Sequence, residues 1–371
     1  MINLTDASVT TPAFVKDPSP APGSAPSRVF DVDVSSTWCV GSVAHGGYLL
    51  CILTDAVIRH QGLVGSAHHD PAHLTSQFFS ATVPGKAQVE IQVVSTTKRW
   101  TRLDVDLYQW SPDANTSTYI SPANQRILRI RSHYLVTTLP EHPEAGVLNY
   151  LSRPCPLLEH PGAIAMSDGG DEVPAKLRFH KGLRWKIVDK VEPNDGSLAW
   201  GCWIEMKGGE EVDKLATLVP FFADVAKNGP EMLPDGLRPG PSWYPTMSLS
   251  LDFKSKFPLS PSSRAQYGTR TFGLYSTTKT IHDGRHDLTV EVWAGPADLG
   301  ARKPEAREGE LDEDRIARWR REGARLVGVS TQMALAVPLE VNRARGRKAG
   351  SDSDAGESNI TPPAEDKKAR L

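Results

Sequence analysis

The sequence lacks the features that mark membrane, secreted and nucleic-acid-binding proteins. No apolar run reaches the 18 or more residues of a membrane-spanning helix, and no basic stretch followed by an apolar one opens the chain as a secretion signal would. Lys and Arg number 42 against 44 Asp and Glu, so a net charge of −2 predicts neither a nucleic-acid nor a membrane partner. The four cysteines are scattered and form no C-x-x-C pair, which favours a reduced intracellular compartment.

Two kinds of reactive site are also missing. The nucleophile-elbow pattern G-x-S-x-G does not occur, which argues against an α/β-hydrolase. His68, His69, Asp70 and His73 lie close together, as metal ligands often do, but His-His-Asp-Pro is typical of a turn and the sequence shows no second ligand cluster. We therefore expect neither a metal nor another cofactor.

The stretch 42–60 predicts one long buried helix that begins at Gly46-Gly47. Apolar residues at 49, 52, 53, 56 and 57 recur at helical spacing, so one face is buried. Glycine is a poor residue for a helix interior, but in the first turn it lets another group approach the backbone. The N–H groups of that turn have no partner within the helix and could bind a carbonyl oxygen that gains negative charge. Tight packing of the turn against a sheet is the alternative.

The order of elements around this helix is that of a hotdog domain, and it occurs twice. Alternating patterns predict a strand before the helix and antiparallel strands after it. In the first half the strands are expected at 28–34, 74–83, 87–96, 101–110 and 126–137. In the second half a helix at 213–228 is expected among strands at 181–192, 198–206, 246–255, 267–281, 286–295 and 325–337. The repeated order predicts an α+β double hotdog, in which a curved antiparallel sheet wraps a long helix in each half.

Composition places the boundaries between these parts. Residues 1–27, rich in Ser, Thr, Pro and Ala, are expected to form a flexible arm, and 339–371 a disordered tail. The domains are expected at 28–139 and 179–338, joined by a linker at 140–178 that is rich in Pro and Gly. The highly charged segment 297–323 is expected to be an exposed insertion in the second domain, with a solvated helix from 312 to 321.

Three strands of the second domain carry polar residues that suit a catalytic site. Asp252 lies in a good strand, where a carboxylate is disfavoured unless it is exposed or has partners. A second strand ends in hydroxyls, among them Thr278 and Thr280, and a third carries Gln332 among apolar residues. Together an acceptor, a hydroxyl and an amide could hold a water molecule for attack on a carbonyl.

These motifs resemble those of the type II acyl-CoA thioesterases, double-hotdog proteins of bacteria and peroxisomes, and of fungal thioesterase-like proteins. The resemblance covers about 28–338. It implies that Asp252, Thr280 and Gln332 are catalytic, and that Gly46-Gly47 corresponds to the Gly-Gly helix start of the family. The chain has Tyr48 where the family often has Gln, and Thr278 lies on the same strand face as Thr280.

The resemblance implies hydrolysis of an acyl-CoA by water that the three residues activate, with Asp252 as general base. Backbone N–H groups at Gly46-Gly47, or at their counterpart in the second domain, would stabilise the oxyanion. Lys254, Lys256 and Arg264 are candidates for the phosphates of CoA by position, although a solvated charged face is the favoured explanation for each. The resemblance to the family is also the reason to expect a homo-oligomer.

Other roles on the same fold stay open. The chain could bind an acyl group without hydrolysing it, or process a carrier-bound thioester in a specialised pathway. Hotdog dehydratases rely on a His paired with Asp or Glu; His45 is the one candidate here, and we expect it to be a packing residue beside Gly46.

The chain ends in Ala369-Arg370-Leu371, which resembles the peroxisomal signal whose commonest form is S-K-L. The upstream Lys367-Lys368 and a flexible tail would suit capture by an import receptor. We therefore expect a peroxisomal enzyme, and a cytoplasmic one if the tripeptide is not read.

Overall fold

The computed structural model describes residues 27–110, 126–140, 150–164, 177–188, 191, 196–207, 215–256, 267–268, 270–301 and 305–342. Residues 1–26 of the predicted arm, most of the predicted linker, Arg264 and the C-terminal tripeptide lie outside these ranges, so what the sequence predicts for them stays a prediction. None of the helices in the described ranges is long and apolar enough to span a lipid bilayer.

The first half contains one long helix and seven strands among its described residues. Its helix is α1 (Gly46–Leu63), preceded by a short 3-10 turn at Ser36–Trp38. Its strands are β1 (Ser27–Val34), β2 (Cys39–Val40), β3 (Val43–Ala44), β4 (Asp70–Phe78), β5 (Gly85–Thr96), β6 (Thr101–Trp110) and β7 (Arg126–Thr137). The alternating patterns in the sequence placed the five long strands β1, β4, β5, β6 and β7 within about five residues, since one buried face imposes the period of two. The two-residue strands β2 and β3 were not predicted.

The second half repeats this order with a shorter central helix. Its helices are α2 (Leu215–Asp224), α3 (Gly229–Met232) and α5 (Asp312–Arg318). Its strands are β8 (Leu183–Ile187), β9 (Leu198–Met206), β10 (Ser242–Trp243), β11 (Thr246–Phe253), β12 (Thr271–Thr278), β13 (Ile281–His282), β14 (Arg285–Ala294), β15 (Arg325–Leu335) and β16 (Val337–Pro338). The helix predicted at 213–228 ends at Asp224, and a short separate turn follows it.

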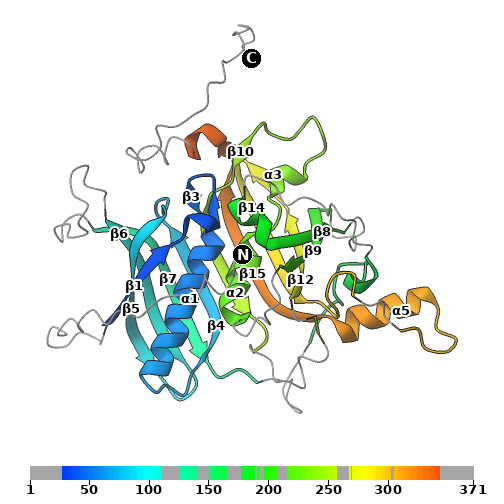
Figure 1. Ribbon diagram of the computed structural model, residues 1–371, viewed down its shortest axis with the longest axis horizontal. Coiled ribbons are helices and arrows are strands. Elements are labelled where there is room, and N and C mark those ends of the chain that lie inside the picture. The colour runs from blue at the N-terminus through cyan, green and yellow to red at the C-terminus, as the bar shows by residue number, and fades with distance from the viewer. Residues whose placement is uncertain are drawn as a thin grey trace, which may run out of the picture.

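The two halves share one antiparallel sheet of twelve strands (Figure 1). Its order is β1-β5-β6-β7-β4-β11-β15-β14-β12-β9-β8, with β13 paired to β14. In each half the first strand of this sheet after the central helix lies at the junction, so β4 pairs directly with β11. Outward from the junction, the strands are β7, β6, β5 and β1 in the first half and β15, β14, β12 and β9 in the second, with β8 at the outer edge of the second half. This repeat of topology confirms the double hotdog fold.

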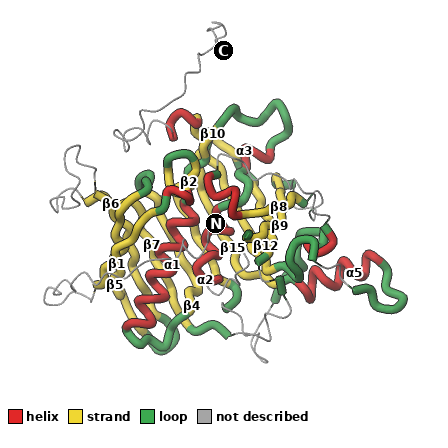
Figure 2. The backbone as a smooth tube through the Cα atoms, viewed as in Figure 1, coloured by secondary structure: helices red, strands yellow, loops and turns green. Residues whose placement is uncertain are grey.

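The two central helices lie side by side on one face of the sheet (Figures 1 and 2). Both are buried in a single hydrophobic core with the inward side chains of the strands. The helices approach closely at Gly47, where an added Cβ would lie 2.7 Å from the carbonyl oxygen of Pro220 and 2.9 Å from the Cα of Phe221. Both atoms belong to the backbone and cannot swing aside, so glycine is required at this position.

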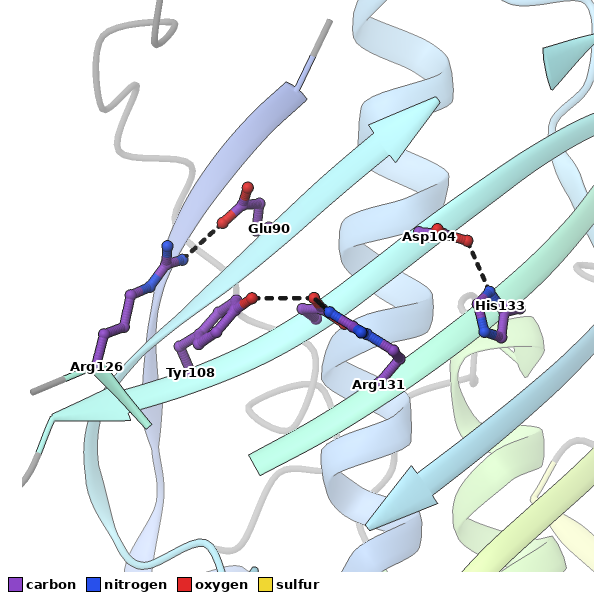
Figure 3. Close-up of polar contacts among 7 residues, drawn as sticks. Glu90, Asp104, Tyr108, Arg126, Arg131 and His133 are labelled. Atoms are coloured by element: carbon purple, nitrogen blue, oxygen red, sulfur yellow. Dashed lines mark hydrogen bonds and ion pairs between the residues drawn. The ribbon is translucent and has the colours of Figure 1, made fainter. Parts of the chain in front are cut away.

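The outer face of the first half is polar. Alternate residues of β5, β6 and β7 form ion pairs on the side of the sheet away from α1 (Figure 3). Arg126 pairs with Glu90 at 2.9 Å, and His133 pairs with Asp104 at 2.6 Å. This face is the solvated side that the alternation predicts.

The outer face of the second half is instead covered by other segments of the chain. Trp203, Tyr275 and Trp293 of its strands form a second, smaller core with Cys155 and Trp319. The predicted insertion therefore has two parts. α5 projects from the sheet (Figure 1) and has no buried residue, as expected. Trp319, just after it, is buried in the second core.

Replacement of Gly47 by alanine should destabilise the protein by about 1–3 kcal/mol, because the new methyl group overpacks the contact between α1 and α2. Gly62 lies on the same helix with nothing within 4 Å of its added Cβ, so Gly62→Ala is the matched control. It should stabilise by about 0.5–1 kcal/mol. Denaturant unfolding of both variants gives the comparison. Equal effects of the two substitutions would contradict the close contact.

Candidate active site

The start of α1 is fixed by the segment that leads into it. The N–H of Ala44 donates to the carbonyl of Thr82 at 2.9 Å, and the N–H of His45 donates to that of Trp38 at 2.9 Å. His45 is the N-cap of α1 and has an extended backbone, and its side chain makes no capping bond. The N–H groups of the first turn are therefore open to other partners.

Asp224, the last residue of α2, supplies one of these partners. Its Oδ2 accepts a hydrogen bond from the N–H of Gly47 at 2.6 Å, and its Oδ1 accepts one from the hydroxyl of Thr246 at 2.9 Å. Both bonds favour the carboxylate form, as does the positive end of α1. Burial opposes them and prevails, so the pKa of Asp224 is raised above its ordinary value.

His45 lies beside this carboxylate. Its ring is packed against Phe179 and Phe221, with centroids 5.5 and 5.4 Å away. Nδ1 lies 3.6 Å from Oδ2 of Asp224 and is buried, so Nε2 is the ring nitrogen that stays accessible. Burial lowers the pKa of His45 in spite of the neighbouring carboxylate. The imidazole is thus held neutral at neutral pH, with one nitrogen free to accept a proton.

A cavity of about 740 Å³ opens at this point between the two halves. Its polar wall includes His45, Gly46, Asp224 and Thr246, and the N–H of Gly46 has no hydrogen-bond partner among the described residues. Aromatic side chains from both halves form much of the remaining wall: Phe78, Phe79, Trp185, Trp200, Trp243 and Tyr244. The cavity thus combines an apolar chamber with a base, a carboxylate and a free backbone donor at a helix start.

The two predicted glycines have different places. Gly46 lines the cavity, whereas the N–H of Gly47 is bonded to Asp224 and its Cα faces α2. The predicted packing contact is made by Gly47, against helix α2 where a sheet was expected. The predicted oxyanion site stays a prediction for Gly46. Gly46 is available to a ligand, and Gly47 allows the helices to pack.

The predicted general base lies elsewhere. The side chain of Asp252 is 49% exposed on the outer face of the sheet, where it accepts hydrogen bonds from Nδ1 of His73 at 2.8 Å and from Lys254 at 3.2 Å. Its neighbours Leu251 and Phe253 point into the core, so the alternation of the strand turns Asp252 outward.

The other two members of the predicted trio are separated from it as well. Gln332 is buried on the inner face, where its Nε2 donates to the carbonyl of Ala223 at 2.6 Å and satisfies the end of α2. Gln332 lies directly opposite Leu249 of the neighbouring strand β11, so these two side chains share one face of the sheet. Asp252 is three residues from Leu249 along β11, so its side chain lies on the other face. Thr280 is exposed beyond the end of β12, and its hydroxyl donates to Asp287 at 2.5 Å. The structure therefore does not bring the side chains of Asp252, Thr280 and Gln332 together around one water molecule.

The predicted cationic residues also lie away from the cavity. Thr246 at the start of β11 lines the cavity, and Lys254 follows eight residues later, roughly 26 Å along an extended strand. Lys256 lies farther along the chain, and neither lysine lines the cavity. The cationic side chains of its wall are Lys227 and Arg238. The described residues of the insertion 297–323 likewise take no part in the wall.

Three of the four residues considered for a metal have other partners. His68 contacts Thr101 and the carbonyl of Lys98, Asp70 accepts from the N–H of Leu139, and His73 bonds to Asp252. In the described ranges no group of three or more His, Cys, Asp and Glu side chains is placed to hold a metal ion.

Sequence reasoning missed Asp224 and set His45 aside. One signal for Asp224 was present: a carboxylate in the last turn of an apolar helix is opposed by the negative end of the helix dipole, so it needs a partner. That partner is the start of α1, 177 residues away in the sequence.

The pKa of His45 should lie below 6.5, and Asp224→Asn should lower it further, because the substitution removes the charge that favours the imidazolium. Asparagine can still accept from Gly47, so the fold should be kept. NMR titration of the ring in both proteins gives the two values. A pKa above 6.5, or one that rises in the variant, would contradict the geometry of the pair.

Comparison with known proteins agrees with this fold. The model of the acyl-CoA thioesterase N-terminal domain matches residues 34–122, and that of the acyl-CoA thioesterase C-terminal domain matches 162–297. The thioesterase-like protein TwmA of Talaromyces wortmannii is 22% identical over 308 residues, which are 72% of this chain and 83% of TwmA.

Two solved structures share the fold at low sequence identity. An acyl-CoA thioesterase II from Mycobacterium marinum has a TM-score of 0.54 at 11% identity, over 84% of this chain and 93% of that one. A hotdog protein of unknown function from Alicyclobacillus acidocaldarius has a TM-score of 0.55 at 13% identity, over 91% and 99% of the two chains. Since the two family models together match more than half of the sequence, the chain belongs to the acyl-CoA thioesterase family of double-hotdog thioester hydrolases.

Proposed function

We propose that the enzyme hydrolyses an acyl-CoA thioester in the cavity between its two halves, with His45 and Asp224 as the catalytic pair. The observation that carries the proposal is the convergence of three groups at one end of the cavity: the accessible Nε2 of His45, the buried carboxylate of Asp224 and the free N–H of Gly46. The side chains of Asp252, Thr280 and Gln332 do not face a common point in this way.

In the proposed reaction, the oxygen of a water molecule attacks the thioester carbonyl while Nε2 of His45 takes its proton. The carbonyl oxygen becomes an oxyanion and accepts a hydrogen bond from the N–H of Gly46 at the positive end of α1. A donor of this kind is typically worth about 3–4 kcal/mol in the transition state. When the tetrahedral intermediate collapses, the C–S bond breaks and the imidazolium returns the proton to the thiolate of CoA. Asp224 stabilises the imidazolium in between.

The distance of 3.6 Å between His45 and Asp224 is longer than a hydrogen bond. Catalytic contacts are often loose before substrate binds and shorten when it does. Burial lowers the pKa of His45, so its imidazole is neutral before the reaction. The carboxylate of Asp224 then stabilises the imidazolium that forms when Nε2 takes a proton from water.

The cationic part of the wall is the proposed site for the phosphates of CoA. Lys227 and Arg238 both line the cavity. Arg238 is held by the carbonyl of Leu233 and by the exposed carboxylate of Asp235. Burial lowers the pKa of Lys227, and the negative charge of a phosphate would raise it again.

A second function has a specific observation in its favour. A His and an Asp that face one cavity can also remove a proton and deliver one to a hydroxyl, as in the dehydration of a 3-hydroxyacyl thioester. We had expected His45 to be a packing residue, but it has an acidic neighbour in the cavity. Release of free thiol distinguishes hydrolysis from dehydration, because dehydration leaves the thioester intact. A chain that only binds acyl groups would give neither product.

The variants Asp224→Asn and His45→Gln should each lower kcat by about 10²–10⁴-fold, because each removes part of the proton-transfer pair. Asp252→Ala is the matched control, since this carboxylate lies on the opposite face of the sheet; its kcat should stay within about twofold of the wild type. The assay is thiol release from acyl-CoAs, with thermal unfolding as a check on folding. Loss of activity in Asp252→Ala, with activity kept in Asp224→Asn and His45→Gln, would contradict the proposed pair and support the predicted site at Asp252, Thr280 and Gln332.

The variants Lys227→Ala and Arg238→Ala should raise the KM for an acyl-CoA by about fivefold each, if each contact with a phosphate contributes about 1 kcal/mol. The KM for the matching acyl-pantetheine, which lacks the nucleotide phosphates, should not change. Lys254→Ala serves as the control. An equal rise of KM for both substrates would show that the two residues act on the acyl or pantetheine part instead.

A further inference from the structure

Asn228 is an N-cap residue whose side chain does not cap its helix. It precedes α3 in the sequence Asn-Gly-Pro-Glu, which suits a helix start, yet its side chain makes no bond to the N–H groups of that helix. Its Oδ1 instead accepts a hydrogen bond from Nε2 of His286 at 3.1 Å. Asn228 also lines the cavity. The side chain thus contacts His286 and the cavity, and not the helix start.

His286 fixes which way the amide of Asn228 faces. His286 is 1% exposed, and its Nδ1 is closed off from solvent without a partner in the described ranges. Burial lowers the pKa of His286 although Asp287 and Glu231 oppose this effect, so the ring is neutral and carries one hydrogen. The bond to Oδ1 places that hydrogen on Nε2, because a carbonyl oxygen only accepts.

The other end of the amide is a donor without a partner. Among the described residues, Nδ2 of Asn228 makes no hydrogen bond, and unlike Nδ1 of His286 it is not closed off from solvent. The NH2 group of an asparagine has two hydrogens to donate. Because Asn228 lines the cavity, an acceptor on a molecule bound there can take such a bond.

The backbone around Asn228 is fixed before any ligand binds. Its carbonyl accepts from the N–H of Glu231 at 3.0 Å. An added Cβ on Gly229 would lie 2.6 Å from both Cγ2 and Oγ1 of Thr278, so the chain lies tight against β12. The hydroxyl of Thr278 is itself bonded to the carbonyl of Asp287 at 2.8 Å. Asn228 is therefore a preorganised donor, which lowers the cost of binding.

The place of this donor in the cavity indicates its ligand. Asp224 of the proposed catalytic pair lies shortly before Asn228 in the chain, and Lys227, proposed for a phosphate of CoA, lies directly before it. The pantetheine arm joins the thioester to those phosphates and contains two amide groups, whose carbonyls are hydrogen-bond acceptors. Tyr244 packs edge to face on His286, with centroids 5.9 Å apart, and lines the cavity as an apolar wall for the carbons of the arm.

We infer that Asn228, oriented by His286, binds an amide carbonyl of the pantetheine arm. This inference rests on the proposed hydrolysis of an acyl-CoA in the same cavity, and adds a residue that recognises the thiol part of the substrate.

The test compares octanoyl thioesters of four thiols: CoA, pantetheine, N-acetylcysteamine, which keeps only the amide nearest the sulfur, and ethanethiol, which has none. Asn228→Asp keeps the shape and the acceptor for His286 but puts an oxygen in place of Nδ2. It should raise the KM for octanoyl-CoA and octanoyl-pantetheine about fivefold and leave that for the ethanethiol thioester within about twofold. The result with N-acetylcysteamine identifies which of the two amides is bound.

Three further variants separate this role from a structural one. Asn228→Ala removes the donor without adding a charge and should give the same contrast among the thiols. His286→Leu removes the bond that orients the amide and should raise the same KM values by a smaller factor, whereas His286→Gln can still donate and should restore them. Ser242→Ala is the matched control, because this hydroxyl lines the cavity but donates to the carbonyl of Gly240 at 2.8 Å. It should leave all four KM values unchanged.

An equal rise of KM for the ethanethiol thioester would show that Asn228 acts on the acyl group or on the fold alone, and would overturn the inference while hydrolysis stands. A rise confined to octanoyl-CoA would place Asn228 at the nucleotide and would overturn it too, as would no rise for any thioester.

If none of the thioesters releases thiol, the proposed hydrolysis fails, and calorimetry decides the inference separately. The wild type should then bind octanoyl-pantetheine about fivefold more tightly than Asn228→Asp does. Equal affinities, or no binding to the wild type, would overturn the inference.

Discussion

The hydrogen bond from the N–H of Gly47 to the carboxylate of Asp224 is the contact on which the site depends. It joins the start of one central helix to the end of the other, across 177 residues of sequence. A carboxylate at the end of its own helix is unfavourable, because the helix dipole is negative there. The start of α1 supplies a positive partner, and Gly47 lets the two helices approach closely enough for the bond to form.

The shared sheet makes this contact possible. Because β4 pairs with β11, the two halves are held in register, and both central helices are placed on the same face. The cavity opens where the helix ends meet, so each half contributes to it. His45 and Gly46 come from the first half, and Asp224 and Thr246 from the second. Neither half contains the whole site, which gives a physical reason for both halves to be retained in one chain.

The fold could be predicted from the sequence because it depends on local periodicity. The predicted strands at 101–110, 126–137 and 198–206 agree with β6, β7 and β9, and the repeated order of elements identified the duplication. A strand with one buried face alternates between apolar and polar residues, and a helix with one buried face carries apolar residues every three to four positions. These constraints lie within short segments and can be recognised without knowledge of the partner segments.

The candidate site could be predicted only in part, because it depends on pairing between distant segments. Asp252 was recognised as an unusual residue for its strand, but only the burial of Leu251 and Phe253 in the structure shows that its side chain lies on the solvated face of the sheet. Gln332 was recognised as unusual, and its partner is a helix-end carbonyl that no local pattern indicates. Asp224 was hidden at the end of an apolar helix. Gly46 was found because its position in a first turn is a local feature.

The most direct test of the account is a crystal structure of the enzyme with a ketone analogue of an acyl-CoA, in which a methylene group between the carbonyl and the sulfur prevents hydrolysis. We predict that the carbonyl oxygen lies within hydrogen-bond distance of the N–H of Gly46, with Nε2 of His45 facing the carbonyl carbon. A carbonyl bound beside Asp252, or in the cavity but away from the start of α1, would contradict the account.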